Sequence, residues 1–160
     1  MLSYNNIEEI HNAGFVGFKT VAEMKNGGCR ELPIAGGVYM IIRPYTEKPQ
    51  FLQIGSGGHF KDKDPNVSIE ELRFNWVDNT CVLYIGKATS IKKRLSQYMS
   101  FGRGSKAGHW GGRLIWQLAD VDEMLVCWKA TTEIPRKVEE RMIAEFKSLY
   151  GQWPFANLQD

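Results

Sequence analysis

Three runs of apolar residues along the chain have the length and composition of buried strands. The first, residues 37–43, is rich in β-branched and aromatic side chains and ends at Pro44. The other two are residues 81–86 and 124–128. Such short apolar runs, bounded by glycine, proline or polar residues, are typical of strands in a protein interior. The pattern therefore predicts a small central sheet of three strands.

Helical spacing of apolar residues predicts helices that flank this sheet. One helix follows the second strand at once, with Thr89 or Ser90 as its N-cap. Another begins at Pro135 and runs to about Tyr150, because Gly151 can end it. We therefore expect an α/β protein in which a small mixed sheet is packed by helices.

The remaining segments have weaker patterns. Residues 1–35 carry short helical signals broken by glycines, which predicts a helical N-terminal extension packed on the core. Residues 44–80 are mostly polar and predict a surface loop with a short strand at 51–54 and a helix near 68–77. Residues 113–118 have the pattern of a further helix.

Composition indicates the class of protein but not its chemistry. A chain of 160 residues with 43% hydrophobic residues is long enough for one compact domain. A net charge of +2 is too small to indicate a nucleic-acid partner by itself. The three cysteines lie far apart, which disfavours a disulfide framework and a zinc site. With no signal peptide or membrane segment recognisable, we expect a cytoplasmic protein without a membrane partner.

Glu139 is the residue whose position is most informative. On a helix that advances about 100° per residue it falls within the apolar stripe, whereas Glu140 lies off that stripe and Glu145 at its edge. A carboxylate directed towards the protein interior needs a cation or several donors. Arg94, which borders the apolar stripe of its own helix, is the expected partner. A purely structural salt bridge is the alternative interpretation.

Basic residues cluster around Arg94 in the middle of the chain. The stretch from residue 87 to residue 113 contains no acidic residue. Its cations are Lys87, Lys92, Lys93, Arg94, Arg103, Lys106 and Arg113. Its aromatic residues could stack on bases while the cations bind phosphates. A solvated basic face is the alternative.

Two tyrosines lie on the strongest strands. Tyr39 and Tyr84 each have a glycine two residues away, which allows close approach of the backbone or a ligand. Composition alone would assign both tyrosines to ordinary core packing.

These features together resemble the GIY-YIG nuclease superfamily. Gly37-Val38-Tyr39 and Tyr84-Ile85-Gly86 are similar to its two half-motifs, with valine replacing the first isoleucine. Arg94, Glu139 and Asn157 are similar to the arginine, the metal-binding glutamate and the supporting asparagine of that family. The similarity covers residues 37–43 and 81–157. The family usually joins its half-motifs by a short hairpin, whereas this chain places a long segment between them.

The resemblance implies a GIY-YIG nuclease domain over residues 36–160, with an insertion at 44–80 and an extension at 1–35. The implied fold is of the α+β kind, with a small, mainly antiparallel three-stranded central sheet flanked by helices. The extension and the glycine-rich run 108–113 would mark a bacterial branch of the superfamily. The implied activity is a metal-dependent endonuclease that hydrolyses DNA phosphodiester bonds with Mg²⁺, which Mn²⁺ could replace. No nucleotide cofactor is implied. RNA as substrate, the cleaved structure or sequence, and the oligomeric state stay open.

The resemblance also implies roles for single residues. Glu139 would hold the metal ion, and Arg94 would stabilise the phosphate. One tyrosine would orient or deprotonate the attacking water, and we favour Tyr39 over Tyr84. The supporting residues are Lys87, which would lower a phenol pKa, Asn157, which would form hydrogen bonds, and His109. The expected nucleic-acid contacts are Lys92, Lys93, Arg103, Lys106 and Arg113.

For His109, which we place in a flexible basic loop, DNA contact is the favoured role and general base the second. Two other functions compete with the nuclease. One is a catalytically inactive nucleic-acid-binding module that keeps the fold. The other is an interaction domain whose basic loop meets an acidic protein.

Overall fold

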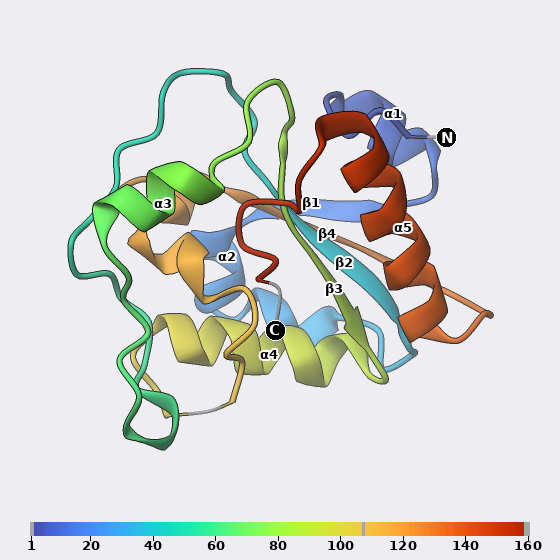
Figure 1. Ribbon diagram of the computed structural model, residues 1–160. Coiled ribbons are helices and arrows are strands. Elements are labelled where there is room, and N and C mark those ends of the chain that lie inside the picture. Colours follow the sequence, from blue (N-terminus) through green and yellow to red (C-terminus); the bar gives the residue numbers. More distant parts are fainter. Residues whose placement is uncertain (1, 107, 159–160) are drawn as a thin grey trace.

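The computed structural model describes residues 2–106 and 108–158 and has an α+β fold built on one antiparallel sheet (Figure 1). The strand order is β1 (Val16–Thr20), β4 (Leu125–Ala130), β2 (Gly37–Ile42) and β3 (Val82–Ala88). All neighbouring strands are antiparallel, as expected.

The sheet has four strands in the described residues, so the prediction of three was wrong. The additional strand is β1, which lies in the N-terminal segment and pairs with β4. The sequence of β1 does not show the alternation of a strand. Gly17 and Phe18 both have positive φ angles, and the register shifts between Gly17 and Lys19. Such a bulge breaks the alternation by which a strand is recognised.

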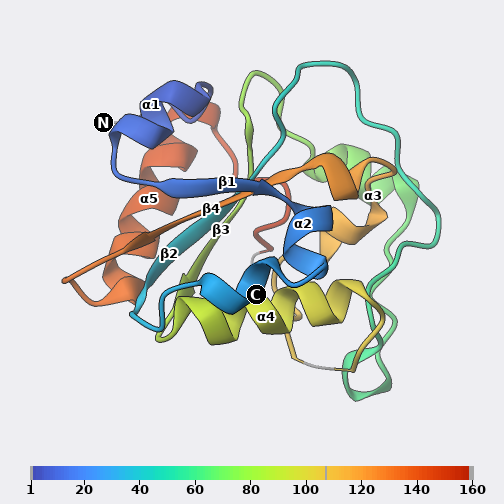
Figure 2. The same cartoon turned by 180° about the vertical axis from the view of Figure 1, so that it is seen from behind.

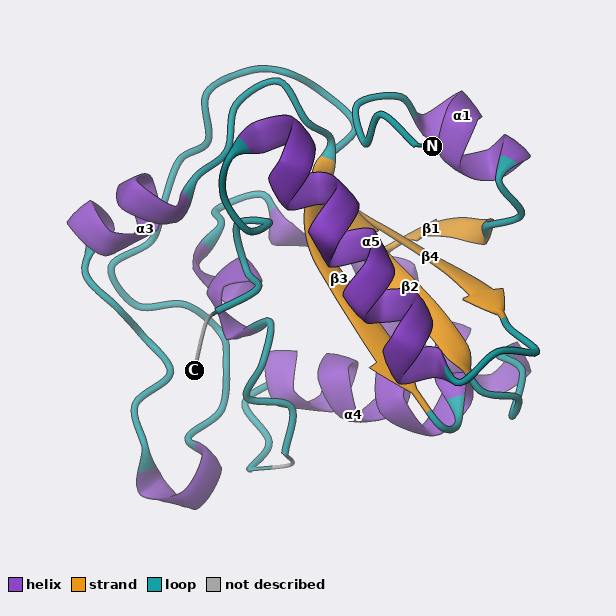
Figure 3. Cartoon of the chain, turned by 45° about the vertical axis from the view of Figure 1, so that its right-hand side comes forward, coloured by secondary structure: helices purple, strands orange, loops and turns teal. Residues whose placement is uncertain are grey.

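Helices cover both faces of the sheet. The α-helices of the described residues are α1 (Ile7–Asn12), α2 (Val21–Lys25), α3 (Ile69–Asn75), α4 (Ile91–Gly102) and α5 (Pro135–Tyr150). Helix α5 lies across β2 and β3 on one face, and α4 lies on the other (Figure 3). Seen from behind, α2 and the segment after it lie over the α4 side (Figure 2). No helix within the described ranges is both long enough and apolar enough to cross a membrane.

The helix boundaries follow the expected signals. Helix α4 begins after Ser90, whose hydroxyl accepts a hydrogen bond from the backbone N–H of Lys93. Helix α5 has Pro135 in its first turn and ends at Gly151, which has a φ angle of 75°. Both helices were predicted, and the structure confirms them.

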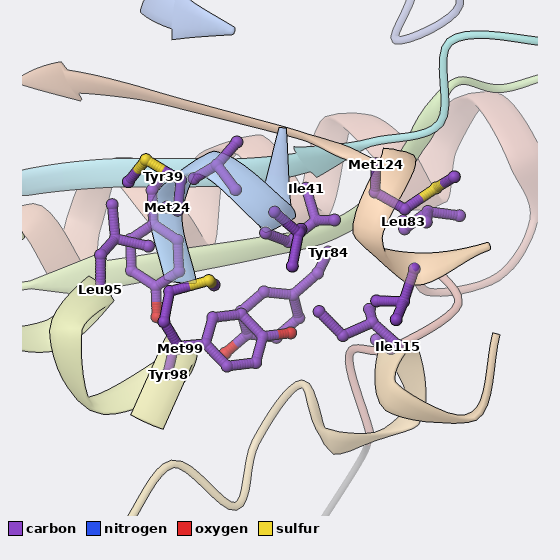
Figure 4. Close-up of a cluster of buried hydrophobic side chains, with 14 of the residues drawn as sticks. Met24, Tyr39, Ile41, Leu83, Tyr84, Leu95, Tyr98, Met99, Ile115 and Met124 are labelled. Carbon is purple, nitrogen blue, oxygen red and sulfur yellow. The ribbon is translucent and has the colours of Figure 1, made fainter. Parts of the chain in front are cut away.

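Strand β2 supplies side chains to two separate hydrophobic clusters, one on each face of the sheet. Tyr39 and Ile41 belong to the cluster under α4, and Val38, Met40 and Ile42 belong to the cluster under α5. All five side chains are fully buried. Figure 4 shows Tyr39 and Ile41 among the apolar side chains of the α4 side. Alternation along a doubly covered strand explains why its sequence has no polar positions.

The segment at residues 44–80 is mostly irregular and is fastened to the core. The helix predicted near 68–77 is present as α3. The short strand predicted at 51–54 is reduced to one bridge, between Phe51 and Leu118. Backbone groups of this segment instead bond to the buried Gln117, whose Nε2 donates to the carbonyl of Leu52 at 3.0 Å.

The helix expected at 113–118 is a 3₁₀ helix, Arg113–Gln117. Three further short 3₁₀ helices occur in the described part of the chain, at Gly28–Glu31, Phe60–Asp62 and Val121–Glu123.

Candidate active site

A cavity of about 360 Å³ lies at the end of β3, between the first turns of α4 and α5. Because β3 is an edge strand, the cavity lies beside both faces of the sheet at once. It is lined by Tyr39, Tyr84, Lys87, Ala88, Thr89, Arg94, Ile134, Pro135, Arg136 and Glu139. The structure thus brings together the four residues expected to form the catalytic group. They come from strands β2 and β3 and from helices α4 and α5.

Tyr39 and Tyr84 form the floor of this cavity on the α4 side. Tyr39 lies opposite Gly86 in the β2–β3 pairing. A Cβ atom at Gly86 would lie 2.3 Å from the Tyr39 ring, so a glycine is required there. Tyr39 is fully buried, whereas Tyr84 keeps 7% of its surface exposed. Tyr84 is therefore the more accessible phenol.

Both phenols are far from ionising in the folded protein. Burial raises the pKa of Tyr39 well above its usual range. Burial also raises the pKa of Tyr84, to about 12, although the charge of Arg94 opposes this change. The expectation that Lys87 lowers a phenol pKa was wrong, because the cation that acts on both tyrosines is Arg94.

Arg94 is half-buried and held by the loop that follows α4. Its Nη1 donates to the carbonyl of Gly108 at 2.9 Å and to Oε1 of Gln97 at 3.3 Å. The ion pair expected between Arg94 and Glu139 is not formed. Arg94 reaches the cavity from the α4 side and Glu139 from the α5 side, with the edge of the sheet between them.

Glu139 instead pairs with Lys87, whose side chain points to the α5 side. The distance from Lys87 Nζ to Glu139 Oε1 is 3.5 Å. The Glu139 side chain is 14% exposed and that of Lys87 is 48% exposed. Burial raises the pKa of Glu139, and the charge of Lys87 opposes the rise. The predicted helical phase is confirmed, because Glu140 is exposed and pairs with Arg136 on the surface.

His109 is fully buried, so its expected place in a flexible loop in contact with DNA was wrong. Its ring stacks on that of Tyr98, with 3.7 Å between centroids and 7° between planes. Its Nε2 lies 2.6 Å from the Tyr39 hydroxyl, and its Nδ1 lies 2.5 Å from the carbonyl of Gly111. Burial and the nearby Arg94 lower the pKa of His109 to about 3. The aromatic ring and these two hydrogen bonds keep the imidazole inside.

Sequence reasoning missed the backbone groups around His109. Tyr98 donates to the carbonyl of Gly112 at 2.6 Å, next to the carbonyl that His109 uses. The available signal was the density of glycines in the run 108–112, which indicates close approach of backbone to side chains.

Asn157 forms the hydrogen bonds expected of it. Its Oδ1 accepts from the N–H of Ile85, and its Nδ2 donates to the carbonyl of Ile85, both at 2.9 Å. The adjacent Ala156 N–H donates to the carbonyl of Leu83 at 2.8 Å. The C-terminal segment thereby pairs with the outer edge of β3 directly before the cavity.

The five residues expected to bind nucleic acid do not form one surface at the cavity. Lys92 and Lys93 lie on the first turn of α4 beside Arg94. Arg103 lies about 13 Å farther along the helix axis and donates to the carbonyl of Lys25. Arg113 stacks on Trp110 at 4.2 Å. Lys106 is exposed in the loop after α4.

The cavity could bind a magnesium ion only if most of the metal ligands came from water and substrate, because the protein offers few. Within the described ranges, no group of three or more histidines, cysteines or acidic residues lies close enough to hold a metal. Glu139 is the acidic residue that lines the cavity. Mg²⁺ is commonly held by one or two carboxylates together with water and substrate phosphates. The half-buried carboxylate of Glu139 suits that mode.

Comparison with known proteins gives no relative for this arrangement. No family model matches the chain, and no curated protein or solved structure matches it either.

Proposed function

We propose that the protein is a metal-dependent endonuclease that hydrolyses phosphodiester bonds of DNA in the cavity at the end of β3. The observation that supports this most is the meeting of Arg94, Glu139 and two tyrosines around one cavity. A planar cation, a half-buried carboxylate and neutral hydroxyls are the groups that phosphoryl transfer by a metal-assisted route needs.

The two sides of the cavity have different tasks in this mechanism. Arg94 has five N–H donors, and those on Nη1 are directed at the carbonyl of Gly108 and at Oε1 of Gln97. The guanidinium can therefore contact the scissile phosphate and stabilise charge that develops on it. Glu139 would hold Mg²⁺, or Mn²⁺ in its place, which when bound polarises the phosphate and stabilises the leaving oxygen. A tyrosine hydroxyl orients the attacking water.

The cations at the rim favour a polyanionic substrate. Lys92 and Lys93 flank Arg94 on α4, and Arg136 lines the cavity from α5. Phosphate contacts of this kind fix the position of a nucleic acid without reading its sequence. DNA is our choice of substrate, and RNA is the next to test. A binding module without turnover is the competing function.

The deciding experiment compares Glu139→Ala with Glu140→Ala. Glu140 is the neighbouring carboxylate on the same helix, but it is exposed and does not line the cavity. We expect Glu139→Ala to abolish Mg²⁺-dependent nicking of supercoiled plasmid, while Glu140→Ala cuts at close to the wild-type rate. Circular dichroism checks that both variants are folded.

Three results would contradict the proposal. Glu139→Ala could cut at the wild-type rate, Glu140→Ala could lose cutting, or the wild type could fail to cut DNA with either metal. In the last case, DNA binding that weakens steeply as salt rises would favour the binding module.

A further inference from the structure

The tip of the segment between β2 and α3, residues 57–64, packs against the glycine-rich loop that follows α4 (Figure 1). The N–H of Gly58 in this tip donates to the carbonyl of Phe101, in the last turn of α4, at 2.9 Å. A Cβ atom at Gly58 would lie 1.8 Å from the carbonyl oxygen of Ser105, so only a glycine fits there. The tip and the glycine-rich loop are therefore packed closely enough to form one surface.

The aromatic rings of this surface hold cations from both of its parts. The Nζ of Lys61 lies 5.2 Å from the centre of the Phe60 ring. The guanidinium carbon of Arg113 lies 4.2 Å from the centre of the Trp110 ring, and the Nζ of Lys63 lies 6.0 Å from the same centre. Cation–π contacts of this kind restrict the positions of long side chains. Trp110 thus brings a lysine of the tip and an arginine of the loop to one place.

Positive charge is in excess on this surface. Residues 60–64 and 105–113 contain four cations and two acids, which are Lys61, Lys63, Lys106 and Arg113 and Asp62 and Asp64. Asp64 is engaged within the tip, where its Oδ1 accepts from the N–H and the Nδ2 of Asn66 at 2.9 and 2.8 Å. The three lysines are exposed. Such a balance favours a polyanionic partner.

The surface continues the α4 side of the cavity. The carbonyl of Gly108 accepts from Arg94 at 2.9 Å, and a Cβ atom at Gly108 would lie 3.0 Å from the Phe60 ring. Gly111 is exposed, and a Cβ atom there would lie 3.5 Å from the hydroxyl of Tyr84. The glycine-rich loop therefore connects the arginine of the cavity to the cations at the tip.

We propose that the tip and the glycine-rich loop bind the backbone of duplex DNA beside the scissile phosphate. The inference rests on the proposed nuclease function, which places the scissile phosphate at Arg94. Lys61, Lys63 and Arg113 contact phosphates, so this binding is independent of sequence. Single-stranded DNA would need open aromatic rings on which its bases stack, whereas Phe60 and Trp110 already carry cations. The duplex backbone is therefore the partner that fits.

Two double substitutions test this surface by charge. Lys61→Ala/Lys63→Ala removes the two lysines of the tip, and Lys19→Ala/Lys48→Ala removes two exposed lysines elsewhere. Lys19 lies on β1, at the opposite edge of the sheet from β3, and Lys48 lies near the start of the segment between β2 and α3. Fluorescence anisotropy follows the binding of a short labelled duplex over a series of salt concentrations. Divalent metal is left out so that the DNA stays intact.

The tip variant should raise the Kd for the duplex by about tenfold over the control variant. It should also lower the slope of log Kd against log salt concentration by about two, because two phosphate contacts no longer release counterions. The wild type should bind the duplex more tightly than a single strand of the same length. Unfolding temperatures check that both variants are folded.

The inference is overturned if the tip and control variants share the same Kd and slope, or if the wild type prefers the single strand or shows no salt-dependent binding of the duplex. Plasmid nicking by the wild type keeps the nuclease function in each of these cases. Conversely, a wild type that shows the expected binding but nicks no plasmid with Mg²⁺ or Mn²⁺ contradicts the nuclease function and leaves the duplex-binding surface in place.

Discussion

The two sides of the candidate site differ in how firmly the fold holds their polar groups. On the α4 side, Tyr39, His109 and Arg94 form hydrogen bonds of 2.5 to 2.9 Å with one another or with loop carbonyls. On the α5 side, Glu139 has one ion-pair partner, Lys87, at 3.5 Å. The hydrogen bonds of the α4 side form without a ligand. On the α5 side, Glu139 can exchange Lys87 for a metal ion, and Lys87 can exchange Glu139 for a phosphate.

This difference has a physical cause in the burial of the two sides. Tyr39 and His109 are fully buried, and an unsatisfied polar group there would destabilise the fold. Folding therefore selects a single arrangement on the α4 side. Glu139 and Lys87 keep contact with solvent, which lowers the strength of their interaction and the cost of breaking it. Substitutions on the α4 side should change stability and activity together, and those on the α5 side mainly activity.

Arg94→Ala is expected to have the largest effect and tests this comparison most directly. Loss of the guanidinium removes charge stabilisation at the phosphate, so cleavage should fall by on the order of a hundredfold to a thousandfold. It also leaves the carbonyl of Gly108 without its donor, which should lower the free energy of unfolding by about 1–2 kcal/mol. Plasmid nicking and urea denaturation measure the two effects.

Lys93→Ala is the matched control for Arg94→Ala. It lies next to Arg94 on the same helix, but it is exposed and does not line the cavity. It should keep stability and kcat, and as an expected phosphate contact it should change only KM. If Arg94→Ala lost activity at unchanged stability, the hydrogen bond from Arg94 to Gly108 would not stabilise the fold. The α4 side would then be no more firmly held than the α5 side.

The sequence was sufficient to predict the elements that carry the site. The strands around Tyr39 and Tyr84, and the helices of Arg94 and Glu139, follow from local apolar patterns and capping residues. The helical phase of Glu139 could be predicted because helix periodicity depends on neighbours in the sequence. Strand β1 could not, since a bulge with positive φ angles interrupts its alternation.

The partners of the charged groups were not predictable in the same way. Glu139 pairs with Lys87 and not with Arg94, because the two faces of an edge strand separate residues that lie on neighbouring helices. The burial of His109 depends on stacking against Tyr98 and on the carbonyl of Gly111, two residues further along the chain. Such contacts are set by tertiary packing, so a histidine between glycines and cations has the sequence pattern of a flexible loop.

Gly112→Ala sharpens the comparison by disturbing the loop behind the α4 side. Gly112 has a φ angle of 84°, and a Cβ atom there would lie 2.6 Å from the Tyr98 hydroxyl. Backbone strain and this clash should together lower the free energy of unfolding by about 3 kcal/mol. Urea denaturation followed by circular dichroism measures the change.

The control for Gly112→Ala is Gly151→Ala at the end of α5. Gly151 also has a positive φ angle, but a Cβ atom there would meet nothing within 4 Å. Its substitution should cost only the backbone strain, about 1 kcal/mol. Equal losses in the two variants would mean that the contact of the loop with Tyr98 is unimportant for stability.

The pH dependence of stability tests whether His109 is buried in its neutral form. Burial and Arg94 lower the pKa of His109 from its usual value of 6.5 to about 3. Between these values the unfolded chain binds a proton that the folded protein does not, so stability falls as the pH falls. At about 1.4 kcal/mol per pH unit below 6.5, the loss between pH 7 and pH 5 is about 2 kcal/mol.

His109→Gln isolates this effect because it removes the titrating group and keeps a hydrogen-bond acceptor. The acidic residues and the other two histidines are the same in both proteins. Their contributions therefore cancel when the two urea denaturation curves are subtracted at each pH. The difference should shrink as the pH falls from 7 to 5, since the wild type alone loses the contribution of His109. A difference that stayed constant would show that His109 takes up protons equally in the folded and unfolded states. The buried His109 beside Tyr39 would then not be held in its neutral form.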